Sequence, residues 1–217
     1  MWDVILFDLD GTVTDPKEGI TKCAAFALSH LGIHVEDPDT LTFFIGPPLL
    51  DTFMEYYGMS EAQALKAIEF YRQRFADVGW VENIPYSDIE NCLTQLQAAG
   101  KTLMIATSKP EDFAVKILEH FGLAQYFEFI CGVSKDKPRQ TKADVIRMAL
   151  EKGNVTDLSR AIMVGDRKHD VLGAHEVGMK AIGVLYGYGE RKEHEENHAD
   201  FIVENIPQLQ TLLLSSN

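Results

Sequence analysis

Residues 7–15 read Phe-Asp-Leu-Asp-Gly-Thr-Val-Thr-Asp and begin at the end of the first apolar run of the chain, residues 3–8. A short run of large apolar residues is typical of a buried strand. Asp8 and Asp10 are separated by one residue, so their side chains point to the same side of an extended chain, and Gly11 then favours a turn. Two neighbouring carboxylates repel each other unless a cation lies close to both. The stretch therefore predicts a buried strand that ends in an acidic, cation-binding turn.

Short apolar runs alternate with amphipathic segments along the rest of the chain. Apolar residues recur at intervals of three or four, as in Ile89, Leu93 and Leu96, which indicates helices between the runs. This alternation predicts an α/β fold, a parallel sheet with helices on both faces. The expected strands cover residues 3–8, 102–107, 128–131, 161–165, 180–185 and 200–203.

The connection between the first two strands is much longer than a β-α-β unit of about 30 residues requires. Within it, Ser60 and Gln63 form a capping-box pattern, and apolar residues follow at helical spacing. We therefore expect a small α-helical cap domain at residues 15–80, inserted into a core domain made of residues 1–14 and 81–217.

Charge and composition exclude several classes of protein. The 217 residues include 20 Lys and Arg against 33 Asp and Glu, a net charge of −13, which repels phosphate backbones and argues against a nucleic-acid partner. No apolar run approaches the about 18 residues of a membrane span, and the start of the chain lacks a secretory pattern. Cys23, Cys92 and Cys131 form no C-x-x-C pair. We expect a cytoplasmic protein with no membrane contact and with buried, reduced thiols.

Acids and hydroxyls also follow two later strands. Asp166 comes directly after the strand at 161–165, and Asp170 lies four residues further on. The strand at 102–107 ends in Thr107, and Ser108 leads toward a helix whose free backbone N–H groups suit a phosphate. Because ligands of open α/β sheets bind at the carboxyl ends of the strands, we expect these side chains to meet Asp8 and Asp10 there. Such a set of carboxylates suits a hard cation, Mg²⁺.

Lys142 stands at the start of a predicted helix, with Thr141 as its cap and Asp144 in its first turn. A cation at a helix N-terminus opposes the helix dipole, by about 1 kcal/mol or less. The position is therefore tolerable on a solvated surface and useful where an anion binds. Lys137, which precedes Pro138, is a competing candidate for the same role.

Taken together and in this order, the elements resemble the haloacid dehalogenase superfamily of phosphohydrolases. The motifs that carry the resemblance are Asp8-Leu9-Asp10-Gly11-Thr12, Thr107, Lys142 and Gly165-Asp166 to Asp170, with a helical insertion after the first strand. The stretch from Lys142 to Gly189 is most similar to phosphoglycolate-phosphatase-like proteins and to 5′-nucleotidase-like phosphatases. One departure from the former group is Ala143, which follows Lys142 where those proteins have a Lys-Pro pair.

This resemblance implies a Rossmann-like core and a Mg²⁺-dependent phosphomonoesterase, a monomer or homodimer, that acts on a small-molecule phosphate ester, with phosphoglycolate or a nucleoside 5′-monophosphate expected first. Asp8 would be the nucleophile that forms an aspartyl-phosphate, and Asp10 would transfer protons. The implied metal ligands are Asp8, the backbone carbonyl of Asp10, Asp166 and Asp170. The implied phosphate-binding residues are Thr107, Ser108 and Lys142.

Other functions fit parts of the sequence. A phosphomutase of the same fold would need a second phosphate site in the cap. A carbon–halogen hydrolase would need neither Asp10 nor a metal. His194 to His198 match the H-E-x-x-H pattern of zinc proteases, but their neighbours are polar and no third ligand follows. A non-catalytic regulatory protein would have no need of the acids retained here.

Overall fold

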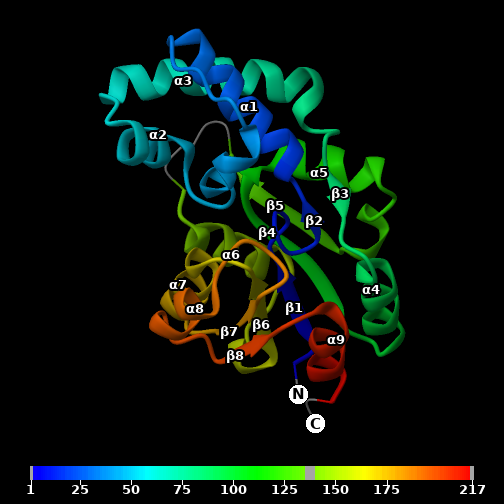
Figure 1. Ribbon diagram of the computed structural model, residues 1–217. Helices are drawn as coiled ribbons and strands as arrows, with labels where there is room; N and C mark the ends of the chain where they lie inside the picture. The colour runs from blue at the N-terminus through cyan, green and yellow to red at the C-terminus, as the bar shows by residue number, and fades with distance from the viewer. Residues whose placement is uncertain (1, 135–139, 216–217) are drawn as a thin grey trace. The chain divides into compact units, whose positions relative to one another are not determined.

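The computed structural model, which describes residues 2–134 and 140–215, contains a sheet of six parallel strands (Figure 1). Its spatial order is β5-β4-β1-β6-β7-β8, so β1 lies between β4 and β6. All six expected strands are confirmed, and β4 runs further than expected, to Pro110. The strands are β1 (Val4–Phe7), β4 (Thr102–Pro110), β5 (Phe129–Val133), β6 (Ala161–Gly165), β7 (Lys180–Val184) and β8 (Phe201–Val203).

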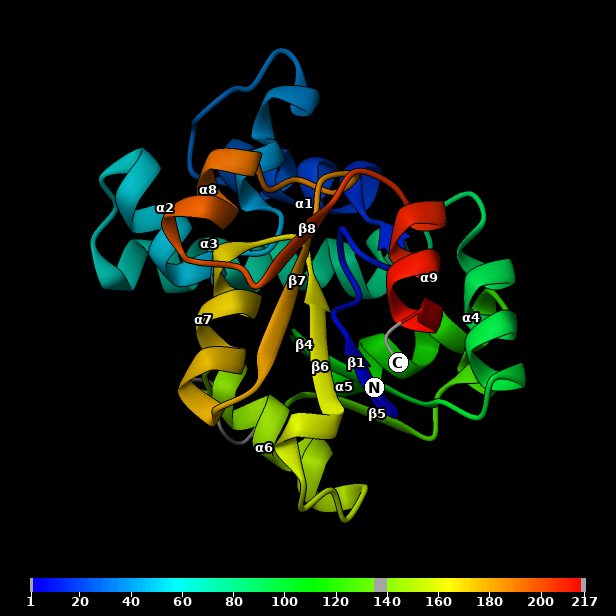
Figure 2. The ribbon, with the colours of Figure 1, turned by 90° about the horizontal axis from the view of Figure 1, so that it is seen from below.

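Helices cover both faces of this sheet, as the alternating pattern predicts. On one face Leu6, Met104 and Met163 pack beneath α6 and α7, and on the other Phe7 meets Phe127 edge to face. Figure 2 shows α6 and α7 on one side of the strands and α4 and α9 on the other. The helices are α4 (Ile89–Ala98), α5 (Glu111–His120), α6 (Lys142–Lys152), α7 (Lys168–Val177), α8 (Arg191–Glu196) and α9 (Ile206–Ser215), with short 3₁₀ turns η3 (Ala124–Tyr126) and η4 (Leu158–Arg160).

The chain divides into two compact units. One consists of residues 1–15 and 85–217 and contains the sheet, and the other consists of residues 16–84 and is helical. The segments that join them are two short strands, β2 (Thr14–Asp15) and β3 (Ile84–Pro85), which pair with each other. Cys23, Cys92 and Cys131 are buried, as expected, and none of them forms a disulfide within the described residues. No helix in the described residues is long and apolar enough to cross a membrane.

The helical unit is built on the contact between α1 and α3. Both helices bury small residues, Ala24 and Ala27 on α1 and Ala64 and Ala67 on α3, as suits helices that pack closely. The expected capping box begins α3, where the Ser60 side chain accepts from the Gln63 N–H at 3.4 Å. The elements of this unit are α1 (Lys17–His30), η1 (Pro38–Phe44), α2 (Leu49–Tyr57), α3 (Glu61–Arg74) and the π-helical turn η2 (Phe75–Gly79).

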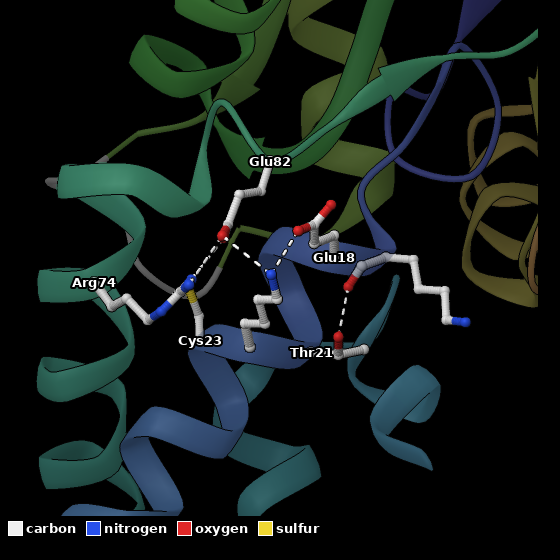
Figure 3. A network of polar contacts seen from close by, with 7 residues as sticks. Glu18, Thr21, Cys23, Arg74 and Glu82 are labelled. Carbon is white, nitrogen blue, oxygen red and sulfur yellow. Dashed lines mark hydrogen bonds and ion pairs between the residues drawn. The ribbon is translucent and has the colours of Figure 1, made fainter. Parts of the chain in front are cut away.

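A partly buried polar network joins the end of α3 to the end of the helical unit (Figure 3). The Arg74 guanidinium donates two hydrogen bonds to the Glu82 carboxylate, at 2.7 and 3.0 Å, and a third to the Cys23 thiol at 3.3 Å. Lys22 on α1 adds an ion pair with Glu82 at 3.6 Å. The network therefore ties α1 and α3 to the segment that leads back to the sheet.

Candidate active site

The register of the central strands brings the acidic motifs to one edge of the sheet. Phe7 on β1 is paired with Ile105 on β4 and with Val164 on β6. Asp8 follows Phe7, and its backbone N–H donates to the Val164 carbonyl at 2.9 Å. Because all three strands are parallel, the residues that follow them lie side by side at the carboxyl edge, where open α/β sheets bind ligands.

Three carboxylates gather at this edge. Asp8, Asp166 and Asp170 each place one oxygen within 4.8 Å of the others, and all three are buried. Asp170 lies in the first turn of α7 and accepts a hydrogen bond from the Arg167 N–H at 3.1 Å. Three of the four acids expected from the sequence therefore meet in a single cluster.

Two glycines allow the chain to approach Asp166 closely. Gly11 has a φ of +82°, and a Cβ on it would lie 2.1 Å from Oδ2 of Asp166. A Cβ on Gly187 would lie 2.3 Å from the Gly11 carbonyl oxygen. Next to Gly187, the Tyr188 N–H donates to Oδ2 of Asp166 at 2.8 Å. The loop after β7 thus fixes one oxygen of Asp166, a role that sequence reasoning missed; the closely spaced Gly187 and Gly189 were the signal available.

Lys142 is buried among these acids. Its ammonium lies 2.8 Å from Oδ1 of Asp8 and 2.8 Å from Oδ1 of Asp170, and it donates to the Ala106 carbonyl at 3.1 Å. The predicted cap is present, since the Thr141 side chain accepts from the Asp144 N–H at 3.2 Å. The anions beside this helix N-terminus are therefore the chain's own carboxylates. The competing candidate, Lys137, lies outside the described residues.

The fourth acid, Asp10, is paired with a different lysine, Lys109. Its Oδ2 lies 2.6 Å from the ammonium of Lys109, and both side chains are largely buried. Thr107 is also buried, and its hydroxyl accepts from the Lys109 N–H at 3.2 Å, whereas Ser108 is exposed. Sequence reasoning did not single out Lys109, and no periodicity or motif in the sequence marks it.

Burial raises the pKa values of three acids of the site, Asp166, Asp170 and Asp10. Burial, together with the charges of Asp170 and Asp8, raises the pKa of Asp166 well above its usual range. The pKa of Asp170 rises to about 6, because burial and the charge of Asp8 outweigh the effect of Lys142. Burial also raises the pKa of Asp10, although Lys109 opposes the shift.

A divalent cation fits this arrangement. Oδ1 of Asp166 is buried and has no hydrogen-bond partner among the described residues. Three carboxylates around one point supply the oxygen ligands that Mg²⁺ prefers, and its charge offsets their repulsion.

The H-E-x-x-H pattern does not form a comparable group. His194 on α8 is fully buried, and His198 lies beyond the end of that helix. Within the described residues, Asp8, Asp166 and Asp170 lie close enough together to share a metal ion, and neither histidine belongs to this group.

Comparisons with known proteins agree with this geometry. The family model described as haloacid dehalogenase-like hydrolase matches residues 5–184. The chain is 45% identical over 197 residues to a 5′-nucleotidase of Pseudomonas aeruginosa, covering 89% of each protein. It is 41% identical to the tyrosine-protein kinase PtkA of Mycobacterium tuberculosis over 92% of this chain and 65% of that protein. A crystal structure of a predicted phosphatase from Clostridium acetobutylicum superposes with a TM-score of 0.94 at 45% identity, covering 99% of each chain.

Proposed function

The chain belongs to the haloacid dehalogenase-like hydrolases and is a phosphatase, and from this premise we propose that it hydrolyses small phosphate monoesters through a phosphorylated Asp8, with Mg²⁺ as cofactor. The observation that carries the proposal is the cluster of Asp8, Asp166 and Asp170, two of which, Asp8 and Asp170, also contact the ammonium of Lys142. A buried carboxylate held by a lysine, at the edge of the sheet where ligands bind, is suited to act as a nucleophile.

In the first step, an oxygen of Asp8 attacks phosphorus and the bond from phosphorus to the leaving oxygen breaks. Asp10 gives its proton to that oxygen, so that an alcohol departs instead of an alkoxide. In the second step, water attacks the aspartyl-phosphate while Asp10 takes a proton from it, which releases inorganic phosphate and restores both carboxyl groups.

The other residues orient the reacting groups and neutralise charge during both steps. Lys142 orients Asp8 and places a positive charge near the phosphoryl group that is transferred. Phosphoryl transfer depends mainly on such positioning and charge neutralisation. Thr107 lies in β4, in the irregular stretch between Ala106 and Pro110, and its hydroxyl would contact a phosphoryl oxygen. Asp8, Asp166, Asp170 and the Asp10 carbonyl would hold Mg²⁺, which when bound neutralises charge on the acids and on the phosphoryl oxygens.

The relatives and the helical unit support a proposal for the substrate class. The similarity to a 5′-nucleotidase favours a nucleoside 5′-monophosphate, with phosphoglycolate as the second choice. The helical unit, residues 16–84, would act as a cap that excludes water and selects the leaving group.

The experiment is a phosphate-release screen over nucleoside monophosphates, sugar phosphates and phosphoglycolate, combined with acid-quench trapping of phosphate on Asp8. We expect turnover with Mg²⁺ and a trapped aspartyl-phosphate in the wild type, and neither in Asp8→Asn. Glu176→Gln, an exposed carboxylate on α7, is the matched control and should behave as the wild type. Turnover by Asp8→Asn would overturn the covalent mechanism, and transfer of phosphate within the substrate without release would indicate a phosphomutase.

A further inference from the structure

Lys109 is a buried lysine with a defined partner and no place in the chemistry described so far. Its ammonium lies 2.6 Å from Oδ2 of Asp10, and the side chains of Lys109 and Asp10 are 5% and 12% exposed. Oδ1 of Asp10, by contrast, is buried and has no hydrogen-bond partner among the described residues. The two oxygens of this carboxyl group are therefore in different environments.

An irregularity at the end of β4 places Lys109 beside Asp10. Ala106 pairs with Cys131, and Pro110 pairs with Val133, so that four steps along β4 match two steps along β5. The extra residues form a bulge, which changes the direction of the side chains that follow it. A Cβ on Gly132 would lie 2.5 Å from the Lys109 carbonyl oxygen, so the bulge is packed tightly against β5. The position of Lys109 is thus set by backbone packing on a rigid strand.

We infer that Lys109 is a positioning residue for proton transfer, which holds Oδ2 of Asp10 and so confines the transferred proton to Oδ1. In the first step the Oδ1–H bond breaks and the leaving oxygen gains the proton; in the second, a water O–H bond breaks and the Oδ1–H bond forms again. The hydrogen bond from Lys109 to Oδ2 persists through both steps. The inference rests on the proposed function, because it assigns a role within the same two-step reaction.

A proton-positioning role has a signature that a structural role lacks. A poor leaving group, such as the ribose oxygen of a nucleoside monophosphate, needs a proton when it departs, whereas p-nitrophenolate does not. Loss of proper proton transfer therefore slows phosphorylation of Asp8 by a nucleoside monophosphate. The rate of phosphorylation by p-nitrophenyl phosphate stays almost unchanged. The second step needs Asp10 as a base with either substrate.

The experiment compares Lys109→Met and Lys109→Arg with Lys101→Met by rapid quench, using a nucleoside monophosphate and p-nitrophenyl phosphate. Lys101 is the matched control, because it is equally buried at 8% exposure and donates to the Trp2 carbonyl at 2.7 Å, not to a carboxylate. For Lys109→Met we expect phosphorylation by the nucleoside monophosphate to fall about 10²-fold or more, and phosphorylation by p-nitrophenyl phosphate to change only a few-fold. Aspartyl-phosphate should accumulate with the second substrate. Lys109→Arg should restore part of the rate, and Lys101→Met should show no dependence on the leaving group.

Three outcomes would overturn the inference. The first is an equal loss of phosphorylation rate with both substrates, the second is a rise in KM alone, and the third is equal behaviour of Lys109→Met and Lys101→Met. Each would mean that Lys109 binds substrate or only supports the fold. Absence of a trapped phosphate in the wild type would instead refute the proposed function itself, so the two failures are distinguishable.

Discussion

The ammonium of Lys142, the first residue of α6, lies 2.8 Å from Oδ1 of Asp8, which directly follows β1, although the two residues are far apart in the sequence. The same ammonium lies 2.8 Å from Oδ1 of Asp170, so one cation serves two buried acids. Burial alone would lower the pKa of Lys142, but the two carboxylates outweigh it and raise the pKa above its ordinary value. Lys142 is therefore a charged structural element of the site as well as a candidate phosphate ligand.

We predict that Lys142→Met lowers both activity and stability. The loss of one charged contact to the transition state should reduce kcat/KM by about 10²-fold or more, roughly 3 kcal/mol. Removal of a single partner leaves two buried carboxylates unpaired, which should cost about 3–5 kcal/mol of unfolding free energy in metal-free protein. Steady-state kinetics and urea unfolding test both effects.

Lys152→Met is the control for this variant, because Lys152 lies on the same helix and is 41% exposed. It should leave both quantities nearly unchanged. Full activity in Lys142→Met would contradict the assignment, and would direct attention to Lys137.

The second prediction concerns Mg²⁺ and pH. The pKa of Asp170 is about 6 in the folded protein against an ordinary value of 3.8, so between these values the folded state binds more protons than the unfolded state. Metal-free protein should therefore lose stability as pH rises from about 4 to about 6. Because Mg²⁺ binds the ionised acids, the increase in Tm that it produces should be larger at pH 7 than at pH 5.

Thermal unfolding in Mg²⁺ and in EDTA, at several pH values, measures this effect, and activity should disappear in EDTA. Asp166→Asn should abolish most of the Mg²⁺-dependent increase in Tm. Full turnover in EDTA, or an unchanged Mg²⁺ effect in Asp166→Asn, would argue against the metal site.

The acids of the site could be predicted from the sequence for a simple geometric reason. Asp8 and Asp166 directly follow apolar runs, and parallel strands bring their carboxyl ends to one edge of the sheet. Lys109 could not be predicted in this way, because its position depends on a bulge at the end of β4 that leaves no periodic pattern. The Tyr188 N–H is a backbone donor that no residue type marks, so its neighbours Gly187 and Gly189 were the only signal for it in the sequence. Residues that regular strands bring into the site could be predicted from the sequence, whereas residues placed by irregular backbone could not.

The third prediction tests the close approach of the loop after β7. A Cβ on Gly187 would lie 2.3 Å from the Gly11 carbonyl oxygen and 2.4 Å from Cβ of Asp166. Gly187→Ala should therefore displace Asp166 and weaken Mg²⁺ binding by about 10-fold or more, as loss of outer-sphere support commonly does.

Gly100→Ala is the control, because no atom lies within 4 Å of its added Cβ, although its φ of +75° brings strain of about 1–2 kcal/mol. It should lower Tm without changing the Mg²⁺ concentration at half-maximal activity; a similar result for Gly187→Ala would contradict the role of the loop.

The fourth prediction concerns the Arg74–Glu82 pair of the helical unit (Figure 3). Burial acts to raise the pKa of Glu82, but the hydrogen bonds and charge of Arg74 outweigh it and lower the pKa below the ordinary value of 4.5. A lowered folded-state pKa adds stability that is present above about pH 4.5 and is lost as pH falls through the lowered value. Glu82→Gln should therefore lower the unfolding free energy by about 1–3 kcal/mol at pH 7, and this difference from the wild type should shrink below pH 4.5.

Asp39→Asn, which breaks the exposed pair with Lys17, is the control and should lower the unfolding free energy by about 1 kcal/mol or less. Hydrogen exchange of α1 and α3 amides across this pH range measures the stability of both variants. If the loss of stability in Glu82→Gln stays constant with pH, packing and not the ion pair stabilises this end of the unit.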